Sequence, residues 1–225
     1  MHFGPNEIPM KNTSGIDDLL MATDAPYLLS ALAEYHDEME SLLRDTGHAR
    51  LTDVRLDTYE AAIEAEILAS KYQQEFASLL RYSIVTSAYG ICERGLHQLC
   101  LHAKERLGLR FDPCDMKSGA EMDKFKTFLD KSGVDVGNLD CWSFLADLTK
   151  LRNAIVHSGG GFLGEPEHTK HIKHIKSLID KFPGLGTTED YGITEINLAR
   201  DLCSWVIKRV GETIEEVFGR IDNAK

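Results

Sequence analysis

The chain has 225 residues, of which 43% are hydrophobic and 27% are charged. This length accommodates one large domain or a domain with an appendage, and this share of apolar residues fills an ordinary core. The formal net charge of −11 excludes a general nucleic-acid coat protein, which needs many phosphate-neutralising lysines and arginines. It leaves open an enzyme that contacts a few phosphates in a local basic cleft.

Residues 1 to about 15 are rich in glycine, proline and asparagine, which predicts an irregular arm. A first helix is expected over 26–43, because Pro26 suits an opening turn and apolar residues then recur at three- and four-residue steps. Gly47 is expected to end it. Residues 1–50 are therefore interpreted as an arm with a helical extension.

The segment from about residue 51 to 107 contains no glycine or proline before Gly90. It predicts one very long helix or two in succession, with an apolar face broad enough for the centre of a bundle. Gly90 and Gly95 lie inside that face, and each costs about 1 kcal/mol of helix stability relative to alanine. Their presence suggests the close approach of a neighbouring helix or a local kink.

The remainder of the chain also has the pattern of helices separated by glycine- and proline-containing loops, with no clear β-alternation and no internal repeat. Asp140 is a candidate N-cap for a helix that runs toward Val156. Residues 51–225 are thus predicted to form an all-α bundle. Its other helices are expected at about 120–131, 165–181 and 194–220.

No stretch approaches about 18 uninterrupted apolar residues, and the first residues lack the basic and apolar regions of a secretory signal. The five cysteines are widely spaced, with no CxxC pair, which favours neither a disulfide framework nor a zinc site. We therefore expect a reduced, cytoplasmic protein that contacts no membrane and holds no metal or cofactor.

One segment at the end of the helix that starts near Asp140 combines three kinds of polar group. Arg152, Asn153 and His157 lie within six residues and are followed by Gly159, Gly160 and Gly161. Asn153 and His157 share a helix face, whereas Arg152 and His157 are about 140° apart around a straight helix. One phosphate can meet both side chains only if the last turn unwinds or if two chains converge.

These residue types suit RNA cleavage, although the same residues are also ordinary at a helix end. An imidazole accepts a proton from a ribose 2′-hydroxyl near neutral pH, and an arginine holds phosphate oxygens while charge builds. The alternative is capping, because cationic side chains are favourable beside the free carbonyls of a last turn. Composition alone favours the cap.

The stretch Leu-Arg-Asn-Ala-Ile-Val-His-Ser-Gly-Gly at 151–160 resembles the signature of the HEPN superfamily, in which Arg-Asn-x3-His lies near the end of a bundle helix. The upstream segment 83–96, with Glu93 inside it, resembles the long helix of that family. The resemblance covers about residues 55–220, and only 151–160 is specific.

The resemblance implies an HEPN-like bundle and a metal-independent endoribonuclease whose two chains build a shared cleft. It also implies a role in antiphage defence or in a toxin system. Carried over to this chain, Arg152 and His157 are catalytic, Asn153 is supporting, and Glu93 is a polar residue that faces the same cleft. Other members of the family keep the fold and only bind nucleotides or proteins.

The segment 168–176 is the chain's basic cluster, and it follows the glycines closely. It is expected to be either a solvated helix face or a patch that contacts RNA phosphates. A metal site at its histidines is a third alternative, which the pattern favours least. Arg94 is either a phosphate contact or a surface ion pair. The candidate RNA contacts are Lys150, Lys170, Lys173 and Arg94.

The leading prediction is a homodimeric endoribonuclease that leaves a 2′,3′-cyclic phosphate and a 5′-hydroxyl, with His157 as general base and Arg152 as phosphate clamp. The second is a non-catalytic module that binds a nucleotide or a protein. The third is a toxin-like nuclease held inactive by a regulatory or antitoxin protein that docks on residues 1–50.

Overall fold

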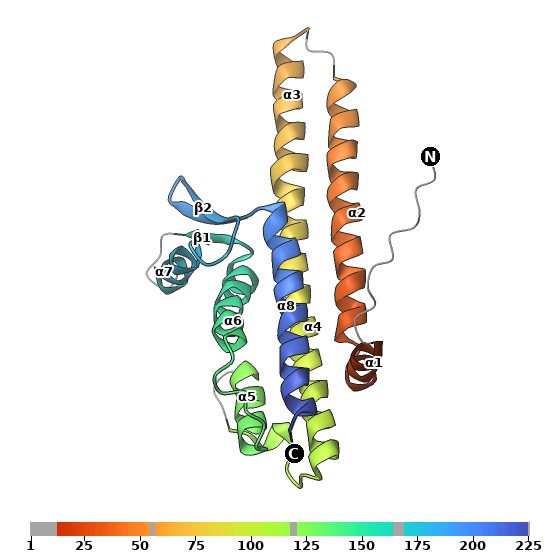
Figure 1. Ribbon diagram of the computed structural model, residues 1–225. Coiled ribbons are helices and arrows are strands. Elements are labelled where there is room, and N and C mark those ends of the chain that lie inside the picture. Colours follow the sequence, from red (N-terminus) through yellow and green to blue (C-terminus); the bar gives the residue numbers. More distant parts are fainter. Residues whose placement is uncertain (1–12, 55–56, 118–120, 164–168, 225) are drawn as a thin grey trace, which may run out of the picture.

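The computed structural model describes residues 13–54, 57–117, 121–163 and 169–224. Within these ranges the protein is mostly helical and carries one small three-stranded sheet (Figure 1). The predicted all-α class is therefore confirmed at the coarse level, and the sheet is an element that the sequence patterns did not indicate. None of the described helices is long and apolar enough to cross a membrane.

Two helices in the first half of the chain differ from the prediction, one in where it begins and one in where it ends. Helix α1 (Thr13–Ala22) begins inside the segment expected to be irregular, of which residues 1–12 lie outside the described ranges. Helix α2 (Ala25–Thr52) runs through Gly47, which does not end it. The reason is packing: a Cβ at Gly47 would lie 2.8 Å from Cβ of Tyr72, so this glycine lets two helices approach closely.

The segment after residue 51 forms two helices in succession. Helix α3 (Tyr59–Ser70) passes through a π-helical turn (Lys71–Glu75) into the 32-residue helix α4 (Phe76–Leu107). Helix α3 has no buried residue, whereas α4 has twelve. The upper half of this helical rod therefore projects beyond the core together with the end of α2 (Figure 1).

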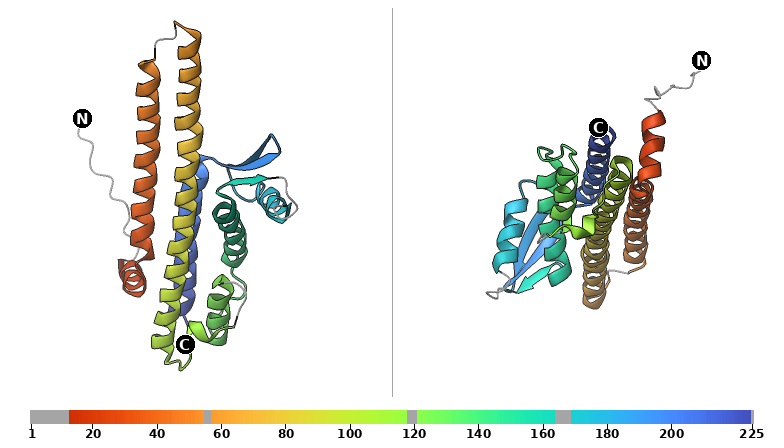
Figure 2. Two further views of the ribbon diagram at one scale, coloured as in Figure 1. Left: turned by 180° about the vertical axis from the view of Figure 1, so that it is seen from behind. Right: turned by 90° about the horizontal axis from the view of Figure 1, so that it is seen from below.

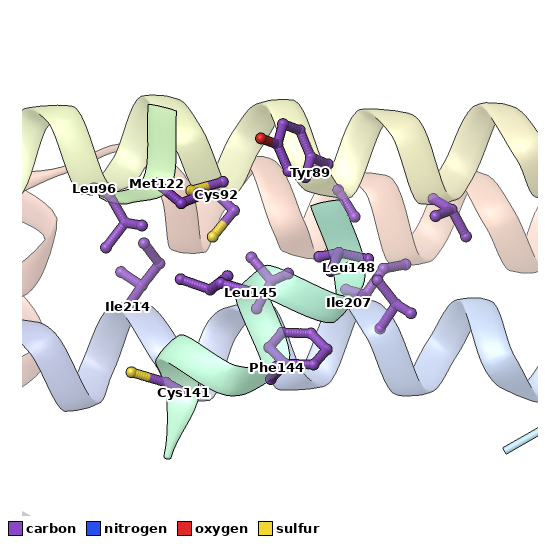
Figure 3. Packing of buried hydrophobic residues seen from close by; sticks show 14 of the residues in the cluster. Tyr89, Cys92, Leu96, Met122, Cys141, Phe144, Leu145, Leu148, Ile207 and Ile214 are labelled. Atoms are coloured by element: carbon purple, nitrogen blue, oxygen red, sulfur yellow. The ribbon is translucent and has the colours of Figure 1, made fainter. Parts of the chain in front are cut away.

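Helix α4 packs most extensively against α8 (Arg200–Asp222) and α2. Helices α2 and α6 (Cys141–Ser158) lie on opposite sides of the α4–α8 pair (Figures 1 and 2). Figure 3 shows Phe144, Leu145 and Leu148 of α6 between the buried side chains of α4 and α8. The four helices thus share one hydrophobic core, which includes Leu29 of α2.

The predicted division near residue 50 does not coincide with a break in this packing. Leu19 and Ala25 belong to the same core cluster as the buried residues of α4 and α8. At Gly95 a Cβ would lie 2.8 Å from both Ala25 Cβ and Ile214 Cδ1. The predicted close approach is confirmed at Gly95, whereas at Gly90 no atom lies within 4 Å of the added Cβ.

The sheet has the order β1–β3–β2 and is antiparallel throughout. Its strands are β1 (Gly161–Leu163), β2 (Leu185–Asp190) and β3 (Ile193–Leu198). The predicted last helix over 194–220 is confirmed from Arg200 onward as α8, but its start is wrong, because 193–198 alternates as a strand with Thr194, Ile196 and Leu198 buried. The two-residue turn Tyr191–Gly192 has positive φ at both positions, as the right-handed twist of a hairpin favours.

Two shorter helices flank the part of α6 that carries Arg152, Asn153 and His157. Helix α5 (Glu121–Lys131) agrees with the prediction over 120–131, apart from residue 120, which is outside the described ranges. Helix α7 (Thr169–Leu178) ends three residues before the predicted limit of 165–181, and residues 165–168 of that prediction lie outside the described ranges. It packs against α6 and β2, so the basic cluster lies beside the end of α6.

Candidate functional site

Helix α6 presents its polar residues because its apolar stripe faces the core. Leu148, Leu151 and Ile155 are buried, as the helical spacing predicts. His157 is consequently exposed, and Arg152 is half-buried beside α4. The helix stays regular through Ser158. Its last turn therefore does not unwind, and Arg152 and His157 are not brought together within one chain.

Backbone hydrogen bonds hold the end of α6 in place. Gly159 adopts the left-handed conformation (φ +61°), and its N–H donates to the Ile155 carbonyl over 2.8 Å. The Gly160 N–H donates to Oγ of Ser158 over 3.2 Å, and the Gly160 carbonyl accepts from the Ile196 N–H of β3 over 2.8 Å. The glycines therefore tie the helix end to the sheet instead of serving as a loose hinge.

Arg152 lies on the seam between α6 and α4. Its guanidinium carbon is 5.4 Å from the centre of the Tyr89 ring, and its Nη1 donates to Oδ1 of Asn153 over 3.0 Å. Burial raises the pKa of Tyr89, and the nearby Glu93 carboxylate adds to this effect, while a hydrogen bond with Thr149 and the Arg152 charge oppose it. The charges of Arg152 and Glu93 thus both act on Tyr89, a residue that the sequence patterns did not indicate, and Asn153 joins them through Arg152.

His157 lies next to a second histidine on a different helix. The His157 ring is 6.1 Å from the ring of His171 in α7, with 43° between the ring planes. His171 in turn stacks on the buried Phe162 of β1, with 5.9 Å between ring centres and 10° between planes. The sequence signal for this neighbour was the position of the basic cluster just after the glycines, which predicted proximity without naming His171.

The predicted RNA-contacting cations have different surroundings. Lys150 donates to Oδ1 of the buried Asp147 over 2.7 Å, and Lys181 donates to Oδ2 over 2.6 Å. Burial would raise the pKa of Asp147, but these two hydrogen bonds outweigh it and lower that pKa. Lys150 and Lys181 thus share one carboxylate, so Lys150 is held in an ion pair while the three groups together keep one net positive charge.

Lys173 of α7 is exposed, whereas the side chain of Lys170 lies outside the described atoms. Lys176, on the same helix, donates to Glu189 of β2 over 2.7 Å. Arg94 makes an ion pair with Asp24, its Nε lying 3.2 Å from Oδ1 and its Nη2 2.5 Å from Oδ2. Asp24 caps α2, on the side of α4 opposite α6, so Arg94 does not join the other candidates (Figure 2).

An open cleft of about 1000 Å³ lies on the other side of the glycines. The start of α4 and the π-helical turn form one wall, and the face of the sheet forms the other. Its lining mixes glycines and apolar side chains with polar ones and includes the charged Glu75, Arg81 and Glu195, whereas Arg152 and His157 are not part of it. Uncharged amide and hydroxyl groups are contributed among others by Ser70, Gln73, Gln74, Ser78, Thr188 and Asn197.

Within the described ranges, no three His, Cys, Asp or Glu side chains gather closely enough to hold a metal ion. No protein-family model matches this chain, and comparison with curated proteins and with solved structures finds no match either.

Proposed function

We propose that this protein is a metal-independent endoribonuclease of the HEPN type. The observation that carries the proposal is the Arg152-Asn153-x3-His157 pattern, with His157 exposed at the anchored end of α6 and Arg152 fixed beside Tyr89. The resemblance of residues 151–160 to the HEPN signature supports the same function.

In this proposal His157 is the general base. Its exposed imidazole accepts the proton of a ribose 2′-hydroxyl, and the 2′-oxygen then attacks the adjacent phosphorus. Arg152 holds the phosphate oxygens, since a guanidinium has five N–H donors and Asn153 accepts from one of them. Asn153 orients Arg152 beside Tyr89, and Glu93 is a supporting acidic group near the same tyrosine. The products are a 2′,3′-cyclic phosphate and a 5′-hydroxyl.

The site is proposed to contain two copies of the chain. Because α6 stays helical through Ser158, Arg152 and His157 remain about 140° apart around it. In a two-fold symmetric dimer, the Arg152 of one copy approaches the His157 of the other. Val156, an apolar residue next to His157, is 51% exposed and would be covered by the second copy.

RNA cleavage in the presence of EDTA tests the nuclease. Wild type is expected to cut single-stranded RNA and to leave cyclic phosphate ends, whereas His157→Ala and Arg152→Ala lose activity by about 10²- to 10⁴-fold. Lys181→Ala is the matched control, because it removes a nearby cation that binds Asp147. A folded wild type that cuts no RNA, or variants that cut as fast as wild type, would refute the proposal.

One observation favours a second candidate, a module that binds a nucleotide or a protein without cutting RNA. The cleft beside Gly159–Gly161 offers amide and hydroxyl groups for hydrogen bonding, and the acidic net charge of the chain suits a protein partner better than long RNA. Under this candidate, nucleotides raise the midpoint of thermal unfolding in wild type and less so in Gln73→Leu, while RNA stays intact.

The HEPN resemblance also supports a role in antiphage defence or in a toxin system, with a regulatory or antitoxin protein as partner. This role predicts that expression of wild type slows cell growth and that His157→Ala expression does not. Equal growth with both proteins would contradict it.

A further inference from the structure

Two imidazoles from different helices meet at the end of α6. His157 belongs to the last turn of α6 and is exposed, and His171 belongs to the first turn of α7 and is half-buried. Their ring centres are 6.1 Å apart. The parallel stacking of His171 on Phe162, which is 1% exposed, fixes the second ring against the core.

This separation suits two groups that act on one phosphodiester. Each hydrogen bond from a ring nitrogen to a phosphate-linked oxygen spans about 2.6–3.2 Å. Rings whose centres lie 6.1 Å apart at a 43° angle can therefore each reach a different oxygen of the same group. In-line cleavage of RNA needs two proton transfers at two such oxygens, one at the attacking 2′-oxygen and one at the departing 5′-oxygen.

We propose that His171 is a second catalytic residue, the general acid that protonates the leaving 5′-oxygen; this inference rests on the proposed ribonuclease function. His157 takes the proton of the 2′-hydroxyl as the 2′-oxygen forms a bond to phosphorus. The bond between phosphorus and the 5′-oxygen breaks, and protonated His171 gives its proton to that oxygen. Both imidazoles regain their starting protonation by exchange with water.

The packing of α7 against the end of α6 places His171 beside His157. Lys176, which lies further along α7, donates a hydrogen bond to Glu189 of β2 and so anchors the helix to the sheet. Phe162 and α7 together hold His171 at a fixed distance from the anchored helix end. General acids of this kind contribute about 10²- to 10⁴-fold to a rate when they are positioned in this way.

The test compares two RNAs that differ only in the linkage at the cleavage site. The cleavage site is first mapped with wild type, and an RNA is then made with sulfur in place of the bridging 5′-oxygen at that site. A thiolate leaves without a proton, so a general acid is no longer needed. The proteins compared are wild type, His157→Ala, His171→Ala, His171→Gln and the control His174→Ala, each checked by thermal unfolding.

We expect His171→Ala and His171→Gln to cut the oxygen-linked RNA about 10²-fold or more slowly than wild type, and to cut the sulfur-linked RNA nearly as fast as wild type. His157→Ala stays slow on both RNAs, and His174→Ala is unaffected.

Three results overturn the assignment of His171 while leaving the nuclease intact. They are full activity of the His171 variants on oxygen-linked RNA, equal loss on both RNAs, and rescue of His157→Ala instead of His171→Ala by sulfur. Absence of cleavage by folded wild type overturns the proposed function itself, so the two failures are distinguishable.

Discussion

Gly160 fixes the direction in which the chain leaves the motif helix. Its φ of +93° is a conformation that residues with a side chain rarely adopt. A Cβ at this position would also overlap the ring of Tyr82, whose hydroxyl donates to the carbonyl of Ile196. Residue-level chemistry thus couples the end of α6 to α4 and to β3 through one glycine.

Gly160→Ala is expected to destabilise the protein by about 2–4 kcal/mol, because backbone strain and overpacking add. Gly159→Ala shares the left-handed conformation but meets no atom within 4 Å, so it is expected to cost about 1–2 kcal/mol. Denaturant unfolding of both variants measures the difference. Equal losses would show that Tyr82 does not pack against Gly160 in solution.

At the scale of elements, the helices with strong apolar stripes were predictable, and α6 ends within two residues of its predicted limit. The strands were not, because β2 is mostly polar and β3 begins with residues that also suit a helix start. The Tyr191–Gly192 turn was the signal that could have revealed them. The site was predictable where it lies within α6, but Tyr89 and His171 come from other elements and needed the tertiary fold.

Gly90 and Gly95 allow a matched test of the crossing of α2, α4 and α8. Gly90→Ala is expected to stabilise the protein by up to about 1 kcal/mol, because alanine is the better helix former and the site is open. Gly95→Ala is expected to destabilise it by about 1–2 kcal/mol net, since Ala25 and Ile214 leave no room. Stabilisation by both substitutions, seen in thermal unfolding, would contradict this close helix crossing.

A network of charged groups around the buried His36 joins α2, α4 and α8. His36 is 1% exposed and faces Asp37 and Glu40 of its own helix, Arg81 of α4 and Arg200 of α8. Burial lowers the pKa of His36, and it outweighs the two carboxylates, which raise it. The folded protein therefore binds a proton at His36 less readily than the unfolded chain does.

The sign of the pH effect follows from this lowered pKa. The contribution of His36 to the free energy of unfolding is fully present above about pH 6.5, the usual histidine pKa. It is lost as the pH drops from there toward the lowered pKa of His36 in the folded protein. Glu40 has a lowered pKa, although burial opposes this, because Arg81 hydrogen-bonds to it; its contribution is lost only below about pH 4.5. The two pH windows are therefore separate.

Thermal unfolding between pH 7 and pH 5 checks the role of His36. The unfolding midpoint of wild type is expected to fall with pH, and that of His36→Leu to fall less. The exposed His48 lies on the same helix, so His48→Leu is expected to follow wild type. Parallel curves for wild type and His36→Leu would show that His36 does not carry the pH dependence.

For the whole molecule, the long α4–α8 pair separates two surfaces. Residues 13–52 cover one side and Arg94 is bound there, while α6, α7 and the sheet cover the other side and carry the candidate site (Figure 1). A single copy holds Arg152 and His157 in one straight helix, about 140° apart. A complete site is therefore expected to take its arginine and its general base from different copies.

A mixture of two inactive variants tests this claim most directly. Arg152→Ala and His157→Ala, co-expressed and purified in equal amounts, form mixed dimers in about half of the population, and each mixed dimer has one intact site of two. Each variant alone is expected to be inactive in EDTA, and the mixture is expected to recover about a quarter of the wild-type rate of RNA cleavage. A mixture as inactive as its components, beside an active wild type, would contradict it.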